Sequence, residues 1–405
     1  MAKAKKKKEV DKAAMFAKIA ADTGGDVIGN LDPIRFFIDT GNLAFNYTCS
    51  GKFIGGGIPS GRITEMYGAS SSGKSLFAAN ILHGCQMMDG WTILLDCENA
   101  ANNEFMERVS GIDSKRLLRH TPPTLEKVFR TVHTVTKQIR DAEEANGLER
   151  KPITFVYDSI TVSPCERELK ENDLPMDHTD ADWKRVVGRK EQPGERAKIC
   201  GAELRKITPL LEKQDVTLVI LNQVREKIGV MYGSPETTGG GGKALEFYAS
   251  LRLRLAARKK IENKALDIFS GINMSVKNVK NRTFRPFVVS DDIKLYFDNG
   301  IDPLSGVLSC LRQDGRIILS GQGNYKVADE YLPDNQTEYK FRAKKVDNTV
   351  KPEVLYDCPK LVDCETTEEV KEYLSHFTTG MAASASGDFE ETDVSFDMDG
   401  NPVTG

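Results

Sequence analysis

Short apolar runs alternate with longer amphipathic runs between Arg62 and about Ser290. This alternation is typical of parallel strands that are connected by helices, so it predicts an α/β fold. Several of the short runs are β-branched or aliphatic and end in polar residues, as buried parallel strands do. The strands predicted on this basis are Ile63 to Tyr67, Thr92 to Asp96, Ile153 to Asp158 and Val216 to Asn222. Because ligands bind at the carboxyl ends of such strands, functional residues are expected there.

The same pattern predicts elements around these strands. Amphipathic runs predict helices over residues 76–88 and 194–213. Apolar and polar positions alternate at residues 250–256 and 272–279, which predicts further strands that extend the sheet. Beyond about Ser320 the chain becomes polar, which indicates a small separate domain.

Two segments interrupt this order. Residues 163–194 are highly charged and contain three prolines, and residues 225–243 are rich in glycine. Both segments leave from the ends of predicted strands, and their composition predicts long surface loops.

Composition narrows the class of protein. The chain has 405 residues, 40% of them hydrophobic, which is enough for two or three domains with full cores. No apolar run reaches the roughly 18 residues that a membrane span needs, and no signal-type segment follows the basic start. The eight cysteines form no CxxC pair, so we expect neither disulfides nor structural zinc, and a cytoplasmic location.

Charge is segregated to the two ends of the chain. The formal net charge is only -3, so any binding of nucleic acid would not rest on a uniformly basic surface. The first eighteen residues are rich in lysine, whereas the residues from Ser384 onward are acidic and contain neither Lys nor Arg. Both ends are predicted to be solvated and disordered, with a regulatory role as the alternative.

The pattern GxxxxGK[ST] lies between the first predicted strand and a predicted helix. Such a loop turns backbone N–H groups and a helix N-terminus toward phosphates. Its lysine reaches the β- and γ-phosphates of ATP, and its hydroxyl binds Mg²⁺. The predicted ATP-binding residues are Gly68, Ala69, Ser70, Ser71, Ser72, Gly73, Lys74 and Ser75, with Ser75 also a metal ligand.

Two acids follow other predicted strands and could complete this site. Asp158 ends the strand from Ile153 and is expected to hold Mg²⁺ through water. Glu98 follows the strand from Thr92 and is the candidate for orienting and deprotonating the attacking water. The alternatives are a turn residue for Asp158 and an acid at a helix N-terminus for Glu98.

Two long segments carry a resemblance to a known family. Residues 222–238 (NQVREKIGVMYGSPETT) with 244–250 (ALEFYAS), and residues 55–63 (GGGIPSGRI), closely resemble the bacterial RecA strand-exchange recombinases. The similarity runs from about Asp39 to Gly306. It indicates a divergent member of the family, with a phage origin suggested by both flanks and phage recombinases of the UvsX type as the nearest cousins. The resemblance implies a RecA-like P-loop ATPase core with a mostly parallel central sheet flanked by helices.

The resemblance divides the chain into four parts. Residues 1–38 would be a basic, partly helical polymerisation segment, and residues 39–306 the ATPase core. Residues 307–376 would form a small C-terminal domain, and residues 377–405 an acidic disordered tail.

In this family ATP lies between neighbouring subunits of a helical filament, so several site residues are implied by the resemblance alone. Lys280 and Arg282 match cations that reach the neighbour's γ-phosphate, although Arg282 replaces a lysine. Gln223 matches the residue that senses the γ-phosphate and passes its state to the following loop. Asn102 and Phe105 match positions that contact adenine, and Phe297 matches an aromatic residue from the adjoining subunit.

The resemblance also makes residues 163–198 and 224–243 the first and second DNA-binding loops. A glycine-rich loop allows backbone N–H groups to approach a sugar-phosphate backbone, while cations supply charge and apolar side chains wedge between bases. The expected DNA-binding residues are Lys198, Arg205, Arg225, Lys227, Ile228, Met231, Gly240, Gly241 and Lys243.

The leading hypothesis is therefore a DNA-dependent ATPase that polymerises on single-stranded DNA, pairs it with homologous double-stranded DNA and exchanges strands. One alternative is a ring-forming helicase or translocase of the same fold, against which residues 222–238 argue. Another is a non-catalytic ATP-binding filament protein, against which Glu98 and Asp158 argue. No membrane partner is expected.

Overall fold

The computed structural model describes residues 11–23, 34–99, 102–168, 194–226, 236–263, 268–321, 323–334, 336–343, 349–377, 389–391, 395–396 and 402–403. The chain divides into two compact units, Met1–Arg35 and Phe36–Gly405. In the first unit, the Asp11 carboxylate accepts hydrogen bonds from the N–H groups of Ala13 (3.0 Å) and Ala14 (3.2 Å) at the start of α1 (Lys12–Thr23). These bonds satisfy donors that the first helical turn leaves unpaired.

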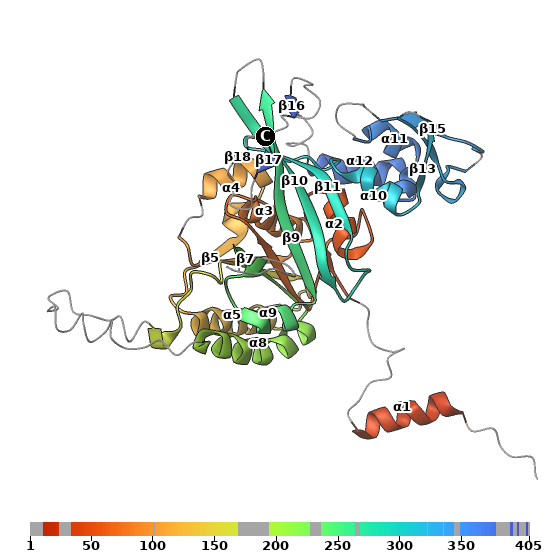
Figure 1. Ribbon diagram of the computed structural model, residues 1–405. Coiled ribbons are helices and arrows are strands. Elements are labelled where there is room, and N and C mark those ends of the chain that lie inside the picture. The colour runs from red at the N-terminus through yellow and green to blue at the C-terminus, as the bar shows by residue number, and fades with distance from the viewer. Residues whose placement is uncertain are drawn as a thin grey trace, which may run out of the picture. The chain divides into compact units, whose positions relative to one another are not determined.

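The large sheet of the second unit joins a parallel part to an antiparallel part. The parallel strands are β3 (Ile63–Gly68), β4 (Trp91–Asp96), β5 (Leu117–His120), β6 (Ile153–Asp158), β7 (Val216–Glu226) and β9 (Leu251–Asn263). The antiparallel strands are β10 (Ile268–Asn281), β11 (Val289–Tyr296) and β12 (Gly300–Ile301). The order across the sheet is β12, β11, β10, β9, β3, β7, β6, β4, β5, so β9 belongs to both parts (Figure 1).

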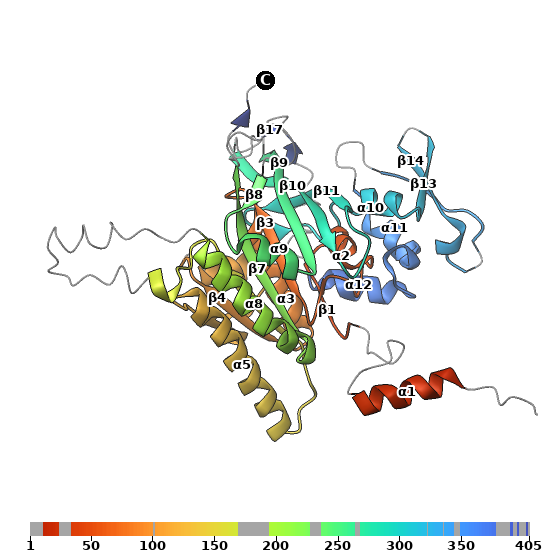
Figure 2. The same cartoon turned by 60° about the horizontal axis from the view of Figure 1, so that its bottom comes forward.

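Helices cover both faces of the parallel strands. One face packs against α3 (Lys74–Met87) and α4 (Asn103–Ser110). The other packs against α5 (Leu125–Ala145), α8 (Glu195–Lys213) and α9 (Gly242–Tyr248), which lie side by side in Figures 1 and 2. The sheet is thus buried on both sides, as the continuous apolar runs predict.

Neighbouring residues of one strand pack into the hydrophobic cores on opposite faces of the sheet. In β4, Leu94 packs in the cluster that contains Phe77 of α3, whereas Ile93 and Leu95 pack in the cluster that contains Phe129 of α5. Side chains alternate across a strand, so a strand with two buried faces must be apolar at most positions on both faces. This requirement explains why β3, β4, β6 and β7 could be recognised from composition.

A third core joins the C-terminal elements to α2 (Leu43–Ser50). Its Tyr47 ring stacks on Phe53 with centroids 4.7 Å apart, and the Tyr373 hydroxyl donates to Asp39 at 3.2 Å. The C-terminal elements are α10 (Val307–Gln313), β13 (Ile317–Gly321), β14 (Asn324–Val327), η3 (Asp329–Tyr331), β15 (Lys340–Arg342), α11 (Pro352–Asp357), η4 (Pro359–Val362) and α12 (Thr367–Ser375).

The second unit also contains several short strands and a short 3₁₀ helix. A pair of strands, β1 (Phe37–Ile38) and β2 (Ile58–Pro59), lies near α2, and η2 (Ser114–Arg116) precedes β5. β8 (Glu236–Thr238) pairs with β7. Among the described residues, no helix is both long and apolar enough to cross a membrane.

The predicted α/β class, strands and sheet extension are confirmed, with small shifts of boundary. The helix expected from residue 76 begins at Lys74, and β7 continues to Glu226. The expectation of a disordered tail stays a prediction, and the described residues of the tail include short strands. There, β16 (Phe389–Glu391) pairs with β9, and β17 (Ser395–Phe396) pairs with β18 (Pro402–Val403). The domain boundaries proposed at residues 39, 307 and 377 stay predictions.

Candidate active site

The predicted phosphate loop connects β3 to α3, as its sequence pattern requires. A Cβ atom on Gly68 would lie 2.3 Å from the Leu255 carbonyl oxygen of β9, so only glycine fits there. Gly73 precedes α3 with a φ of 71°, a left-handed conformation that glycine adopts without strain. The two glycines thus let the backbone curve closely in front of the helix N-terminus, where anions bind.

Lys74 is the first residue of α3, and its ammonium group lies against the loop. Its Nζ donates to the carbonyl oxygens of Gly68 at 3.1 Å and Ala69 at 2.6 Å. Burial lowers the pKa of Lys74, while the charges of Asp158 and Glu98 oppose that change. The cation is therefore kept near the position at which the loop would enclose phosphate.

Ser75 and Asp158 bring two oxygen ligands together from α3 and β6. The Ser75 hydroxyl donates to the Asp158 carboxylate at 2.9 Å. Burial raises the pKa of Asp158 to about 6, and the charges of Glu98 and Asp96 add to the rise. Hydroxyl and carboxylate oxygens suit Mg²⁺, and a cation would offset the repulsion among these carboxylates. The residues present therefore fit the expected metal.

Glu98 lies at the end of β4 beside the end of β6. Its Oε1 accepts a hydrogen bond from the Ser159 hydroxyl at 2.6 Å, and the neighbouring backbones are joined by a bond from Cys97 N to Asp158 O at 2.7 Å. The Glu98 side chain is exposed, whereas Asp96 is buried and pairs with Arg119 at 2.5 Å. Of the two acids, Glu98 is thus the one that can meet a water molecule.

The candidate adenine contacts come from two elements of one chain. Asn102 caps α4 by accepting a bond from Phe105 N at 3.1 Å. Arg108 of the same helix lies 5.7 Å from the Phe105 ring centroid and 3.9 Å from Asp298. Phe297 precedes Asp298, and both aromatic rings are more than two-fifths exposed (43% for Phe105 and 42% for Phe297). Two accessible rings therefore stand on neighbouring elements of the same subunit.

Lys280 and Arg282 lie away from the phosphate loop of their own chain. The Lys280 Nζ donates to the carbonyl oxygens of Glu246 (2.7 Å) and Phe247 (2.8 Å), and Arg282 donates to Phe247 at 3.2 Å. Lys280 lies opposite Arg252 in the register of β10 and β9, and Arg252 lies opposite Glu65 in the register of β9 and β3. Glu65 precedes Gly68 by three residues, or about 10 Å along a strand. These cations thus lie toward the amino end of β3.

Gln223, in contrast, lies directly beside the loop. It pairs with Gly68 in the parallel register of β3 and β7. Its N–H group bonds to the side chains of Asn222 (2.9 Å) and Thr161 (3.3 Å), and its carbonyl accepts from Gly239 N at 2.8 Å. This backbone therefore borders both the phosphate loop and the glycine-rich segment.

The second predicted DNA-binding loop leaves the sheet as a hairpin stem made by β7 and β8. Val224 pairs with Thr238, and Glu226 pairs with Glu236. The tip of the loop, with the predicted contacts Lys227, Ile228 and Met231, lies outside the described residues, as does the side chain of Arg225. Residues 169–193 of the first loop also lie outside them.

Gly240 and Gly241, predicted to contact DNA, are buried at the base of this loop. Both backbone groups of Gly240 bond to the Asn222 side chain at 3.0 Å, and an added Cβ would lie 2.6 Å from Ile160. Gly241 caps α9 with a φ of 74°. Packing and backbone conformation explain these glycines here, since the bonding groups of Gly240 already have partners.

The remaining DNA candidates are exposed cations on two adjacent helices. Lys198 and Arg205 lie on α8 and Lys243 lies on α9, and all three side chains are exposed. The helices contact each other, and Arg205 Nε donates to the Tyr248 hydroxyl at 3.4 Å. An accessible group of cations on helices suits backbone contacts to nucleic acid.

The sequence prediction missed a buried polar network behind the loop. Glu65 of β3 accepts hydrogen bonds from Asn222 (2.8 Å) and from Arg252 (2.5 Å), and Arg252 also pairs with Glu246 at 3.3 Å. Burial raises the pKa of the Glu65 carboxyl, and Arg252 opposes the rise. The available signal was an acid inside an otherwise apolar strand, because buried charges are rare unless they are paired.

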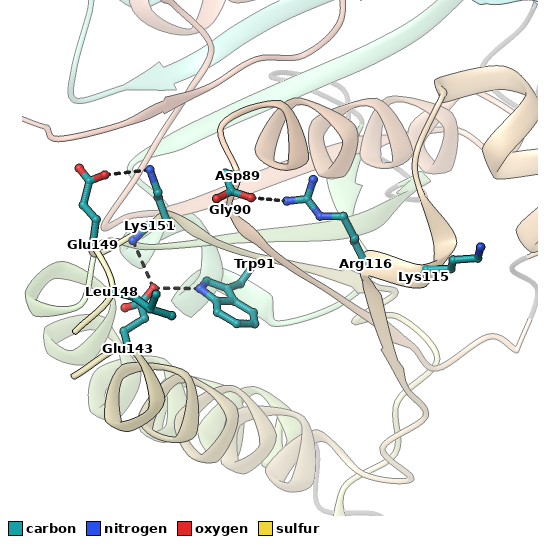
Figure 3. Close-up of a pocket in the computed structure, with 9 residues that line it drawn as sticks. All are labelled: Asp89, Gly90, Trp91, Lys115, Arg116, Glu143, Leu148, Glu149 and Lys151. Carbon is teal, nitrogen blue, oxygen red and sulfur yellow. Dashed lines mark hydrogen bonds and ion pairs between the residues drawn. The ribbon is translucent and has the colours of Figure 1, made fainter. Parts of the chain in front are cut away.

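A surface hollow of about 440 Å³ lies at the opposite end of β4 from Glu98 (Figure 3). The Trp91 indole donates to Glu143 at 2.9 Å at its wall, Arg116 pairs with Asp89 at 2.9 Å, and Lys151 pairs with Glu149 at 2.9 Å. None of the predicted site residues lines this hollow.

Known proteins share much of this chain. A family model described as the RecA N-terminal domain matches residues 24–140 and 185–302, which is more than half of the chain. Protein RecA of Thermus aquaticus is 32% identical over 291 residues, 68% of this chain and 76% of the relative. Protein RecA of Chlorobium chlorochromatii is 32% identical over 286 residues, 70% of each chain. From the family match and these relatives, the chain belongs to the RecA family.

Proposed function

We propose that this chain is an ATP-dependent recombinase that forms filaments on single-stranded DNA and exchanges strands with a homologous duplex, in DNA recombination and repair. The observation that carries the proposal is the convergence at one sheet edge of Lys74, the Ser75–Asp158 pair at 2.9 Å and Glu98, in a chain of the RecA family.

At the phosphates, each residue has a separate task. Lys74 leaves the carbonyl oxygens of the loop and binds the β- and γ-phosphates as a point charge. Ser75 would bind Mg²⁺ directly and Asp158 would hold it through water, and the ion would neutralise phosphate charge. Glu98, now bonded to Ser159, orients the attacking water and accepts its proton.

At the base, Phe105 provides a stacking surface for adenine, with Asn102 at the start of the same helix, and Phe297 provides a second stacking surface. The exposure of both aromatic side chains supports this role. The family resemblance implies that Phe297 reaches the adenine bound by the adjoining subunit, and this stays a prediction.

The site is completed by a neighbour in the filament. Lys280 and Arg282 would stabilise charge that develops on the neighbour's γ-phosphate, as an arginine finger does. Their place near the amino end of β3 supports this role, because it is the end of the strand away from the loop of their own chain.

DNA would bind at the loops that leave the carboxyl ends of β6 and β7. Lys198, Arg205 and Lys243 supply charge from α8 and α9, together with Arg225, Lys227, Ile228 and Met231 of the second loop. The cations would contact the sugar-phosphate backbone and the apolar side chains would wedge between bases. Neither kind of contact identifies the base, so homology would be read by base pairing.

Electron micrographs of the protein with single-stranded DNA and a slowly hydrolysed ATP analogue test the proposal. We expect helical filaments that require both nucleotide and DNA. Closed rings in place of filaments would instead favour a helicase or translocase of the same fold.

A further inference from the structure

We propose that Asn222 is a positioning residue that ties the roots of both candidate DNA loops to the strand that carries the phosphate loop. The proposal rests on the proposed function, since it explains how nucleotide state would reach the DNA-binding segments. It concerns a side chain that lies between the two sites and contacts neither expected ligand.

The Asn222 amide is fully buried, and both of its ends have protein partners. Its Nδ2 donates to Glu65 Oε1 at 2.8 Å and to the Gly240 carbonyl at 3.0 Å. Its Oδ1 accepts from the N–H groups of Gln223 (2.9 Å) and Gly240 (3.0 Å) and from the Thr161 hydroxyl (3.1 Å). The side chain therefore joins the start of the second loop at Gln223 to its end at Gly240.

The root of the first loop meets the same cluster. Ile160 and Thr161 follow β6, where that loop begins, and Arg196 stands near its end. Arg196 donates to the Ile160 carbonyl, and to the Thr161 carbonyl at 2.9 Å. The Thr161 hydroxyl accepts from Gln223 N at 3.3 Å while it donates to Asn222. Both ends of both loops thus meet around one amide.

Glu65 connects this cluster to the nucleotide site. It lies on β3 three residues before Gly68, and its carboxylate holds Asn222 on one oxygen and Arg252 on the other. The register of β3 and β7 also sets Gly68 beside Gln223. A shift of β7 relative to the phosphate loop must therefore move the roots of both loops or break bonds to Asn222.

Breaking those bonds is costly in this environment. A buried polar group that loses its partner forfeits a hydrogen bond that water cannot replace. Satisfied buried networks therefore hold one arrangement and transmit displacement as a unit. Asn222 would make the loop roots respond to nucleotide together, because its amide bonds to Thr161 of the first loop root, to Gly240 of the second and to Glu65 of β3.

The test compares Asn222→Ala with the wild-type protein in three measurements: nucleotide affinity without DNA, the single-stranded DNA concentration that gives half-maximal ATPase, and the melting temperature. We expect nucleotide affinity to stay within about twofold and the required DNA concentration to rise roughly tenfold or more, within the usual range of coupling between sites. An unchanged DNA requirement would refute the role of Asn222. Absence of DNA stimulation in the wild-type protein would instead refute the proposed function.

If Asn222→Ala does not fold, two conservative variants of Thr161 test the role of Asn222. Thr161→Val removes the hydroxyl that bridges Asn222 and Gln223 but keeps the shape of the side chain, and Thr161→Ser restores the hydroxyl. We expect Thr161→Val to raise the DNA requirement with only a small fall in melting temperature, and Thr161→Ser to recover the wild-type value of both. Equal DNA requirements in the two variants would refute the proposal.

Discussion

At the scale of single residues, Lys74 shows how the phosphate loop prepares a charged group for a ligand. Its ammonium group bonds to the carbonyl oxygens of Gly68 and Ala69, which are weaker partners than phosphate oxygens. Burial lowers its pKa, and the nearby carboxylates of Asp158 and Glu98 oppose that effect. The phosphate loop therefore holds the partly desolvated ammonium group of Lys74 where a phosphate group can bind it.

Replacing Lys74 with alanine should weaken nucleotide binding and abolish nucleotide-dependent DNA binding. A hydrogen bond to a charged group contributes about 1.5 to 3 kcal/mol, so we expect roughly 10- to 150-fold weaker binding. Fluorescence titration with an ATP analogue measures the change. Lys115→Ala is the matched control, because Lys115 is exposed in the hollow at the far end of β4. Equal affinities in the two variants would contradict the role of Lys74.

The pKa of Asp158 predicts how magnesium dependence changes with pH. Because this pKa is raised from 3.8 to about 6, the carboxyl loses its charge as the pH falls below about 6. At one unit below the pKa only about a tenth of the molecules keep the charge. We expect the Mg²⁺-dependent part of nucleotide affinity to decline there and to be constant above about pH 7.

Asp158→Asn should remove this pH dependence, because its amide does not titrate. The raised pKa of Asp158 also affects the free energy of unfolding of the protein without metal. The raised pKa stabilises the fold below the unfolded value of 3.8, and this contribution is lost as the pH rises through about 6. An Asp158→Asn variant that kept the wild-type pH profile would show that another group titrates.

At the scale of elements, the sequence was most informative where burial determines composition. β4, β6 and β7 could be predicted because both faces of these strands are buried, which favours apolar residues at nearly all positions. β16 could not be predicted, because it lies in a polar tail and forms by pairing with β9. Pairing with a distant strand leaves no local pattern in the residues that form it.

The residues of the candidate site also differ in whether they could be predicted from the sequence. The phosphate loop has a fixed spacing of glycine, lysine and serine, so Lys74 and Ser75 could be named from sequence. Asn222 could not, because an asparagine at a strand end is common, and its role depends on partners 18 to 157 positions away in sequence. Gly240 resembled a flexible loop residue, although its contacts with Ile160 and Asn222 explain the glycine.

The ion pair between β3 and β9 allows a prediction about stability. Arg252→Met should leave the Glu65 carboxylate buried without its cation, which costs about 3 to 5 kcal/mol of unfolding free energy. Denaturant unfolding measures the loss. Glu65→Met together with Arg252→Met should recover part of it, because no unpaired charge remains. If the double variant lost as much unfolding free energy as the two single variants together, this explanation would be contradicted.

At the scale of the whole molecule, the proposed ATPase requires subunits that complete one another's sites. Lys280→Ala should abolish cooperative, DNA-stimulated ATPase while each subunit still binds nucleotide, because Lys280 is proposed to act at the site of a neighbour. The matched control is Lys277→Ala, since Lys277 is exposed on the same strand. Unchanged turnover in Lys280→Ala, measured over a range of protein concentrations, would refute the shared site.

Strand exchange between single-stranded DNA and a duplex tests the central claim most directly. We expect joint molecules and displaced strand only with ATP and a homologous duplex, and none with Lys74→Ala. Equal product from a heterologous duplex, or no product from the wild-type protein with homologous DNA and ATP, would contradict the account.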